Sequence, residues 1–201
     1  TEDIKILKAI AQTGANALHR AQLYEQTQSQ ARQLETVNEI GRSLAETLHP
    51  PQIYKRISRG LHALLPDLSA IIVSQYDPHE QIITCAYGEY DDQPIDVSTL
   101  PAVPFNPDGQ GPQSQVIREQ KTILVNDLEA RLQSSSHNIS IGPPPYPQSA
   151  IYAPMMVKGQ VAGILQVQSY YLNYFRQSDA DALALVANSA AIMIENAHLF
   201  S

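Results

Sequence analysis

The placement of proline divides this chain into two different parts. All 14 prolines lie at or beyond Pro50, whereas the first 48 residues are rich in the good helix formers Ala, Gln, Glu and Leu. Proline removes a backbone donor and clashes with the preceding helical turn, so a long helix requires its absence. We predict one helix from Thr1 to Leu48, ended by His49-Pro50-Pro51. At about 1.5 Å per residue it would extend roughly 70 Å, so part of it must project or pair.

Within this predicted helix, apolar residues recur at alternating spacings of four and three. Leu23, Leu34, Val37 and Leu44 belong to this seam, with polar or small residues between them. Such spacing is typical of a coiled coil, in which two helices bury their apolar seams against each other. We therefore expect these residues, together with Ile192 near the other end of the chain, to form a homodimer through the terminal helices.

The remainder of the chain predicts a mixed α and β body. Runs of β-branched residues separated by turn residues favour strands, and apolar residues at helical spacing favour helices. The predicted helices and strands are Ile53–Leu65, Ala70–Tyr76, Gln81–Tyr87, Gln110–Gln120, Thr122–Val125, Ala150–Val157, Val161–Gln168 and Ser178–Phe200. The proline-rich or serine-rich stretches Glu89–Gly109 and Glu129–Gln148 predict two long surface loops.

Composition excludes some classes of partner. The chain carries 43% hydrophobic and 16% charged residues, as a folded globular protein does, and its net charge is −7. No Lys or Arg occurs between Arg59 and Arg118, where eight acidic residues fall, so we expect no nucleic-acid binding. The apolar runs are too short to enter a bilayer, so we also expect no direct membrane contact. The single Cys85 leaves no intramolecular disulfide and favours a cytoplasmic location.

One helix type occurs at both ends of the chain. Shifting the chain by 176 positions aligns Leu7 with Leu183 and Ala11 with Ala187, although the body between them occurs once. We interpret residues 1–30 as the closing helix of a preceding domain, continuing as a signalling linker. Residues 31–201 are then the domain that is present.

Two strand sequences carry a resemblance to a known family. Ser149–Met155, with serine first and proline sixth, is followed by Gly159–Val167, which has glycine first and fifth, and then by Phe175 and Asp179. This pattern resembles the GAF domain family. The resemblance implies an α+β fold of the GAF/PAS type, with an antiparallel five- or six-stranded sheet flanked by helices, and long N-terminal and C-terminal helices. It also implies a ligand pocket on one face of the sheet, under the long loops.

The resemblance further implies a function. Family members usually stand in tandem, upstream of a histidine kinase, a diguanylate cyclase or a phosphodiesterase. We expect a non-catalytic sensor module of a sensor histidine kinase in a two-component system, one that binds an unidentified small ligand and signals through its terminal helices. One alternative is a ligand-free adaptor that only dimerises and transmits helix movement. Another is the family's methionine sulfoxide reductase branch, whose catalytic cycle uses several cysteines, whereas this chain has only Cys85.

Several residues are candidates for the walls of the ligand pocket. They are Tyr76, Cys85, Tyr87, Phe105, His137 and Tyr152. A covalent bilin at Cys85 lacks the histidine that usually follows the attachment cysteine in the family, and the cyclic-nucleotide motif lacks its lysine at Tyr174 and its glutamate at Ala180. Haem ligation by His137 and packing of the aromatic residues as core both stay open. The sequence therefore names neither a cofactor nor a metal.

Overall fold

The computed structural model describes residues 50–109, 111–133 and 144–199. Several predictions lie outside these residues. They are the helix over 1–48, its seam residues Leu23, Leu34, Val37 and Leu44, and the candidate pocket residue His137.

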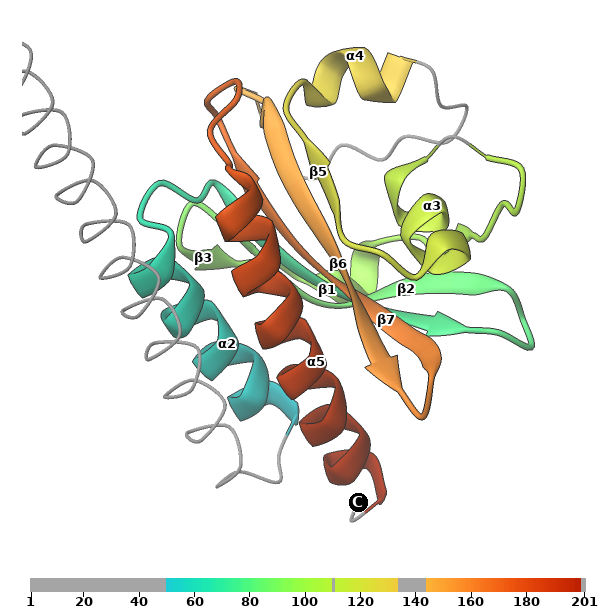
Figure 1. The fold of residues 1–201 in the computed structure, drawn as a ribbon. Coiled ribbons are helices and arrows are strands. Elements are labelled where there is room, and N and C mark those ends of the chain that lie inside the picture. The colour runs from blue at the N-terminus through green and yellow to red at the C-terminus, as the bar shows by residue number, and fades with distance from the viewer. Residues whose placement is uncertain (1–49, 110, 134–143, 200–201) are drawn as a thin grey trace, which may run out of the picture. The chain divides into compact units, whose positions relative to one another are not determined.

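The described chain is built on one antiparallel sheet (Figure 1). Its seven strands are β1 (Ala70–Asp77), β2 (Ile82–Tyr90), β3 (Gln93–Pro94), β4 (Val103–Pro104), β5 (Ile123–Val125), β6 (Ser149–Val157) and β7 (Gln160–Ser169). Their order is β3-β2-β1-β7-β6-β5, and β4 pairs with β2 beside this path. The predicted α+β fold with an antiparallel sheet is confirmed, and the two-residue strands β3 and β4 extend it.

Helices cover both faces of the sheet (Figure 1). Helices α2 (Pro50–Leu64) and α5 (Gln177–Leu199) lie side by side on one face, and α3 (Pro112–Glu119) and α4 (Leu128–Gln133) lie on the other. Helix α2 begins with Pro50 and Pro51. Proline is tolerated there because the backbone N–H groups of the first helical turn have no hydrogen-bond partner within the helix. Among the described residues, no helix is long and apolar enough to cross a membrane.

Each face of the sheet has its own apolar cluster, because side chains alternate along a strand. On the face of α2 and α5, residues such as Ile71, Val73 and Leu165 pack against Ile57 and Leu183. On the face of α3, a smaller cluster gathers the side chains Ile83, Val116, Ile117, Val125, Leu128, Ala150, Tyr152, Val161 and Ile164. The cluster on the α3 face has fewer members than the cluster on the face of α2 and α5. Buried polar side chains, Ser74 and Gln166 among them, also lie on the α3 face.

The two predicted loops contain more regular structure than their composition indicates. The stretch after Tyr90 forms β3, a 3-10 turn (η1, Val97–Thr99) and β4, and the predicted loop from Glu129 begins within α4. These elements are two to six residues long and form because neighbouring strands and Leu128 hold them in place, which local composition does not encode. The last helix begins at Gln177, one residue before the predicted Ser178, and Asp179 in its first turn accepts a hydrogen bond from the Arg176 backbone N–H.

A β-bulge reverses the alternation in β2. Ser74 pairs with Cys85 but Val73 pairs with Tyr87, so Ala86 is an extra residue. Ile83 therefore faces the α3 cluster, while Tyr87, four residues later, packs against the α2 and α5 cluster. Without the bulge both side chains would share one face.

Candidate functional site

A stripe of polar residues crosses the α3 face of the sheet. Gln166 lies on β7 and is 5% exposed, and its cross-strand neighbours are Ile72 on β1 and Tyr152 on β6. Ser74 lies on the same face and is 3% exposed. Burying such groups is costly unless they are hydrogen-bonded, so each needs a partner.

Helix α3 supplies partners to this stripe. Proline at Pro112 and a left-handed residue, Gln120, mark its two ends. The Gln113 amide nitrogen lies 3.4 Å from Ser74 Oγ and 3.3 Å from Gln166 Oε1. These are long hydrogen bonds, at the weak end of the range for amide donors. Gln113 thus offers its amide toward the sheet without a tight partner there.

A half-buried positive charge approaches the same stripe from α4. The Arg131 guanidinium donates to Gln115 Oε1 on α3, and its Nε is buried. Burial raises the pKa of the Tyr152 phenol far above its usual value, and a hydrogen bond with Gln168 and the charge of Arg131 oppose this effect only partly. The Tyr152 hydroxyl is therefore neutral at physiological pH, and it lies within the electrostatic reach of Arg131.

Six side chains form what we call the inner polar cluster. They are Ser74, Gln113, Gln115, Arg131, Tyr152 and Gln166. They come from β1, α3, α4, β6 and β7, and the floor around them is the α3 apolar cluster. A few convergent polar groups on an apolar floor are characteristic of small-molecule sites. One guanidinium, amide groups and two hydroxyls suit a ligand that carries a carboxylate or another small anionic group.

The structure separates the predicted pocket residues. Tyr152 belongs to the inner polar cluster, and Tyr76 and Phe105 border the same face, with ring centroids 5.4 Å apart at 60°. Tyr87 lies on the opposite face, where its ring stacks on Tyr54 of α2 at 5.6 Å. Cys85 stands at the bulge, half-buried, and its Sγ donates to the Tyr87 carbonyl at 3.3 Å.

Sequence reasoning missed the polar members contributed by the helices. Gln113 and Gln115 lie in a helix that was predicted, but glutamine on a short helix resembles an ordinary solvated residue. Arg131 was assigned to a surface loop. A useful signal was available in β7, where Gln166 interrupts the apolar run Ile164 to Val167 at a central position of the sheet.

The sequence matches a family model, and the fold matches solved structures. A family model described as GAF domain matches residues 47–195. A comparison with curated proteins found no match.

Among solved structures, the fold is similar to a free methionine-R-sulfoxide reductase from Neisseria meningitidis, with 18% identity and a TM-score of 0.67 over 86% of this chain and 93% of that one. It is also similar to the GAF domain of a phosphoenolpyruvate-protein phosphotransferase from Coxiella burnetii, with 17% identity and a TM-score of 0.68 over 85% and 97%. A third is residues 122 to 287 of a methyl-accepting chemotaxis protein, with 17% identity and a TM-score of 0.62 over 81% and 98%.

One expectation needs correction here. We expected a non-catalytic chain mainly because Cys85 is its single cysteine, but several solved structures with a similar fold are free methionine-R-sulfoxide reductases, which are enzymes. That expectation was wrong, because enzymes and regulatory domains share this scaffold. What the family model and the antiparallel sheet with its flanking helices do establish is that this chain belongs to the GAF domain family.

Proposed function

We propose that this chain is the ligand-binding regulatory GAF module of a multidomain signalling protein. Its ligand is a small polar molecule held between the sheet and helices α3 and α4. The observation that carries this proposal is the inner polar cluster, in which the amide of Gln113 contacts the buried Gln166 and the guanidinium of Arg131 contacts Gln115 of the same helix. A bound carboxylate is a stronger acceptor than the neutral glutamine and serine oxygens that these donors contact.

A ligand panel tests this proposal. We would measure the thermal unfolding of the full chain with small carboxylic acids, amino acids and cyclic nucleotides. At least one compound should raise the Tm of the wild type, and the shift should vanish in Arg131→Met. Arg176→Met is the matched control, because Arg176 is exposed next to the start of α5 and should leave the shift intact. A ligand shift that survives Arg131→Met would contradict the site.

The signal would leave the domain through α5. Leu185 and Ile192 are 45% and 58% exposed and lie seven residues apart, so they form a stripe on one side of this helix. We propose that this stripe pairs with a second copy of the chain, together with the predicted seam of Leu23, Leu34 and Leu44. Ile192→Glu would place a charge in that interface. Light scattering should then report a dimer for the wild type and a monomer for the variant.

The chemotaxis and phosphotransferase domains that share this fold are pieces of larger proteins, which supports a multidomain origin. We propose a cytoplasmic sensor histidine kinase as the parent, with residues 1–30 closing a preceding GAF-like domain and residues 31–201 forming this one. A dimer that binds no member of the panel would instead favour the ligand-free adaptor.

Reductase activity is the second candidate function, and the fold shared with the Neisseria enzyme favours it. Cys85 would have to act, because it is the single cysteine of the chain. Reduction of free methionine-R-sulfoxide in the presence of dithiothreitol would be measured for the wild type and Cys85→Ser. Turnover that disappears in the variant would establish this function, and equal rates would remove it.

A further inference from the structure

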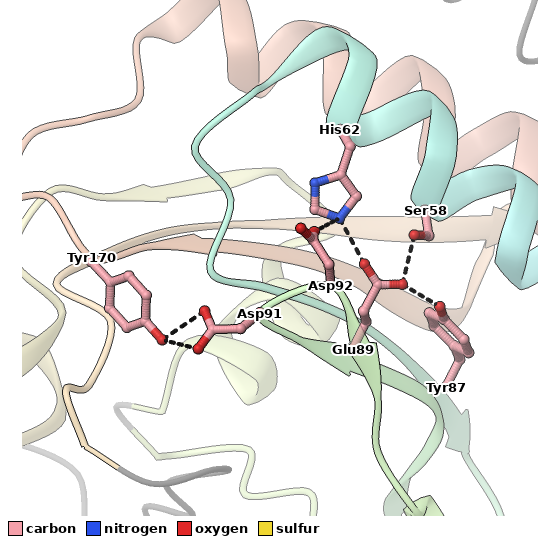
Figure 2. A network of polar contacts seen from close by, with 7 residues as sticks. All are labelled: Ser58, His62, Tyr87, Glu89, Asp91, Asp92 and Tyr170. Atoms are coloured by element: carbon pink, nitrogen blue, oxygen red, sulfur yellow. Dashed lines mark hydrogen bonds and ion pairs between the residues drawn. The ribbon is translucent and has the colours of Figure 1, made fainter.

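A second group of polar side chains lies on the other face of the sheet, between α2 and the end of β2 (Figure 2). Its centre is Glu89, which is 8% exposed. Ser58 and His62, four residues apart on α2, point to the same side of the helix. Ser58 Oγ donates to Glu89 Oε2 at 2.7 Å, and His62 Nε2 lies 2.6 Å from Glu89 Oε1. The bulge in β2 is what turns Glu89 toward α2.

The turn between β2 and β3 brings a second carboxylate to His62. Its two residues, Asp91 and Asp92, have φ values of 47° and 60° and separate the paired residues Tyr90 and Gln93. Two positive φ values identify a type I′ turn, which matches the twist of a hairpin. The turn places Asp92 Oδ1 3.2 Å from His62 Nε2, whereas the Asp91 carboxylate accepts a hydrogen bond from Tyr170 at 2.9 Å (Figure 2).

Three candidate ligand atoms therefore converge. His62 Nε2, Glu89 Oε1 and Asp92 Oδ1 all lie within 4.8 Å of one another. The distances of 2.6 and 3.2 Å are shorter than the separation of roughly 3.4 Å between neighbouring ligands that tetrahedral bonds of about 2.1 Å imply, so the three side chains would move slightly apart to admit an ion. A neutral imidazole with two carboxylates carries two negative charges, which one divalent cation balances.

The buried carboxylate is oriented by its remaining contacts. Tyr87 donates to Glu89 Oε2 at 2.5 Å, as Ser58 does, so Glu89 Oε1 is the oxygen that faces His62. Stacking on Tyr54 holds the Tyr87 ring. Outer hydrogen bonds of this kind orient the ligands of metal sites.

We propose that His62, Glu89 and Asp92 form a binding site for a divalent transition-metal ion, and that Zn²⁺ suits these ligands best. One imidazole nitrogen and two carboxylate oxygens occupy three tetrahedral positions. Asp92, whose side chain is 77% exposed, leaves the fourth position open to water. The ion replaces any proton on His62 Nε2, which passes to solvent, so that the nitrogen binds through its lone pair. A bound ion would tie the last turn of α2 to the β2–β3 turn.

The test is a zinc titration of the untagged, EDTA-treated full chain, followed by isothermal calorimetry. The wild type should bind one equivalent per chain. Asp92→Asn and His62→Gln should each weaken the affinity at least about tenfold. Asp91→Asn is the matched control, because it removes a carboxylate from the same turn but not from the ligand set. It should bind zinc as the wild type does.

Two outcomes would overturn the site. A wild type that takes up no zinc leaves His62 as a plain ion-pair partner of the two carboxylates. Zinc uptake that is equal in the wild type, Asp92→Asn and His62→Gln places the ion elsewhere in the chain. Circular dichroism of the metal-free proteins checks that each variant is folded before its zinc affinity is compared with that of the wild type. Because the Asp92 side chain is exposed, Asp92→Asn is the variant least able to disturb the fold.

Discussion

Replacing Gly163 with alanine should destabilise the domain through one contact. Gly163 lies on β7, between Gln75 of β1 and Met155 of β6. A Cβ at this position would lie 2.2 Å from the backbone oxygen of Ser74 and 2.5 Å from Met155 Cε. The methionine end can rotate away, but Ser74 belongs to a strand paired on both sides. The clash with the carbonyl must be relieved by moving the backbone.

The magnitude follows from two opposing effects. Overpacking a tight core costs about 1–3 kcal/mol, and a conflict with backbone belongs at the upper end. Alanine also restricts the unfolded chain, which returns about 0.4–1 kcal/mol. The net loss in the free energy of unfolding is therefore about 2 kcal/mol. For a domain of this size, that loss lowers Tm by about 4–8 °C.

The assay is urea unfolding followed by far-ultraviolet circular dichroism. Gly159→Asn is the matched control in the same hairpin: Gly159 has φ of +81°, which asparagine tolerates, and no atom lies within 4 Å of the point that a Cβ would occupy there. It should change stability by less than about 1 kcal/mol. A Gly163→Ala variant as stable as the wild type would refute the steric reasoning.

Other positions give further predictions. Burial raises the pKa of the Cys85 thiol to about 11. Because alkylation by iodoacetamide needs the thiolate, its rate should be slow at pH 8 and should increase as the pH rises toward 11. A plot of alkylation rate against pH with its midpoint near the ordinary thiol pKa would contradict this prediction. Tyr152→Phe removes the hydroxyl that bonds Gln168 and should cost about 1 kcal/mol in urea unfolding, as well as weakening any ligand that binds through Arg131. An unchanged unfolding midpoint would show that this hydroxyl is dispensable.

The long elements of the fold could be predicted because their local signals agree with their packing. The strands around Asp77-Pro78 and Lys158-Gly159 have apolar, β-branched sequences with turn residues between them, and both hairpins are present. Gly159 has the positive φ that its turn requires. Helix α4 could not be predicted in this way, because six residues carry little periodicity and Leu128 acquires its role only by packing in the α3 cluster.

The candidate site was less predictable because it depends on register. Tyr76 and Tyr152 were named as pocket residues, and both lie on the α3 face. Tyr87 could not be assigned to a face from the sequence, because the extra residue at Ala86 is invisible until β1 and β2 are paired. The same bulge sends Glu89 to α2. Both polar clusters join residues far apart in sequence, and only the folded sheet brings these together.

The most direct test of the central proposal is native mass spectrometry of the chain after incubation with a metabolite extract. The account predicts at least one small-molecule mass on the wild type and on Arg176→Met that is absent from Arg131→Met. The same masses on all three proteins, or none on the wild type, would contradict a ligand site at the inner polar cluster.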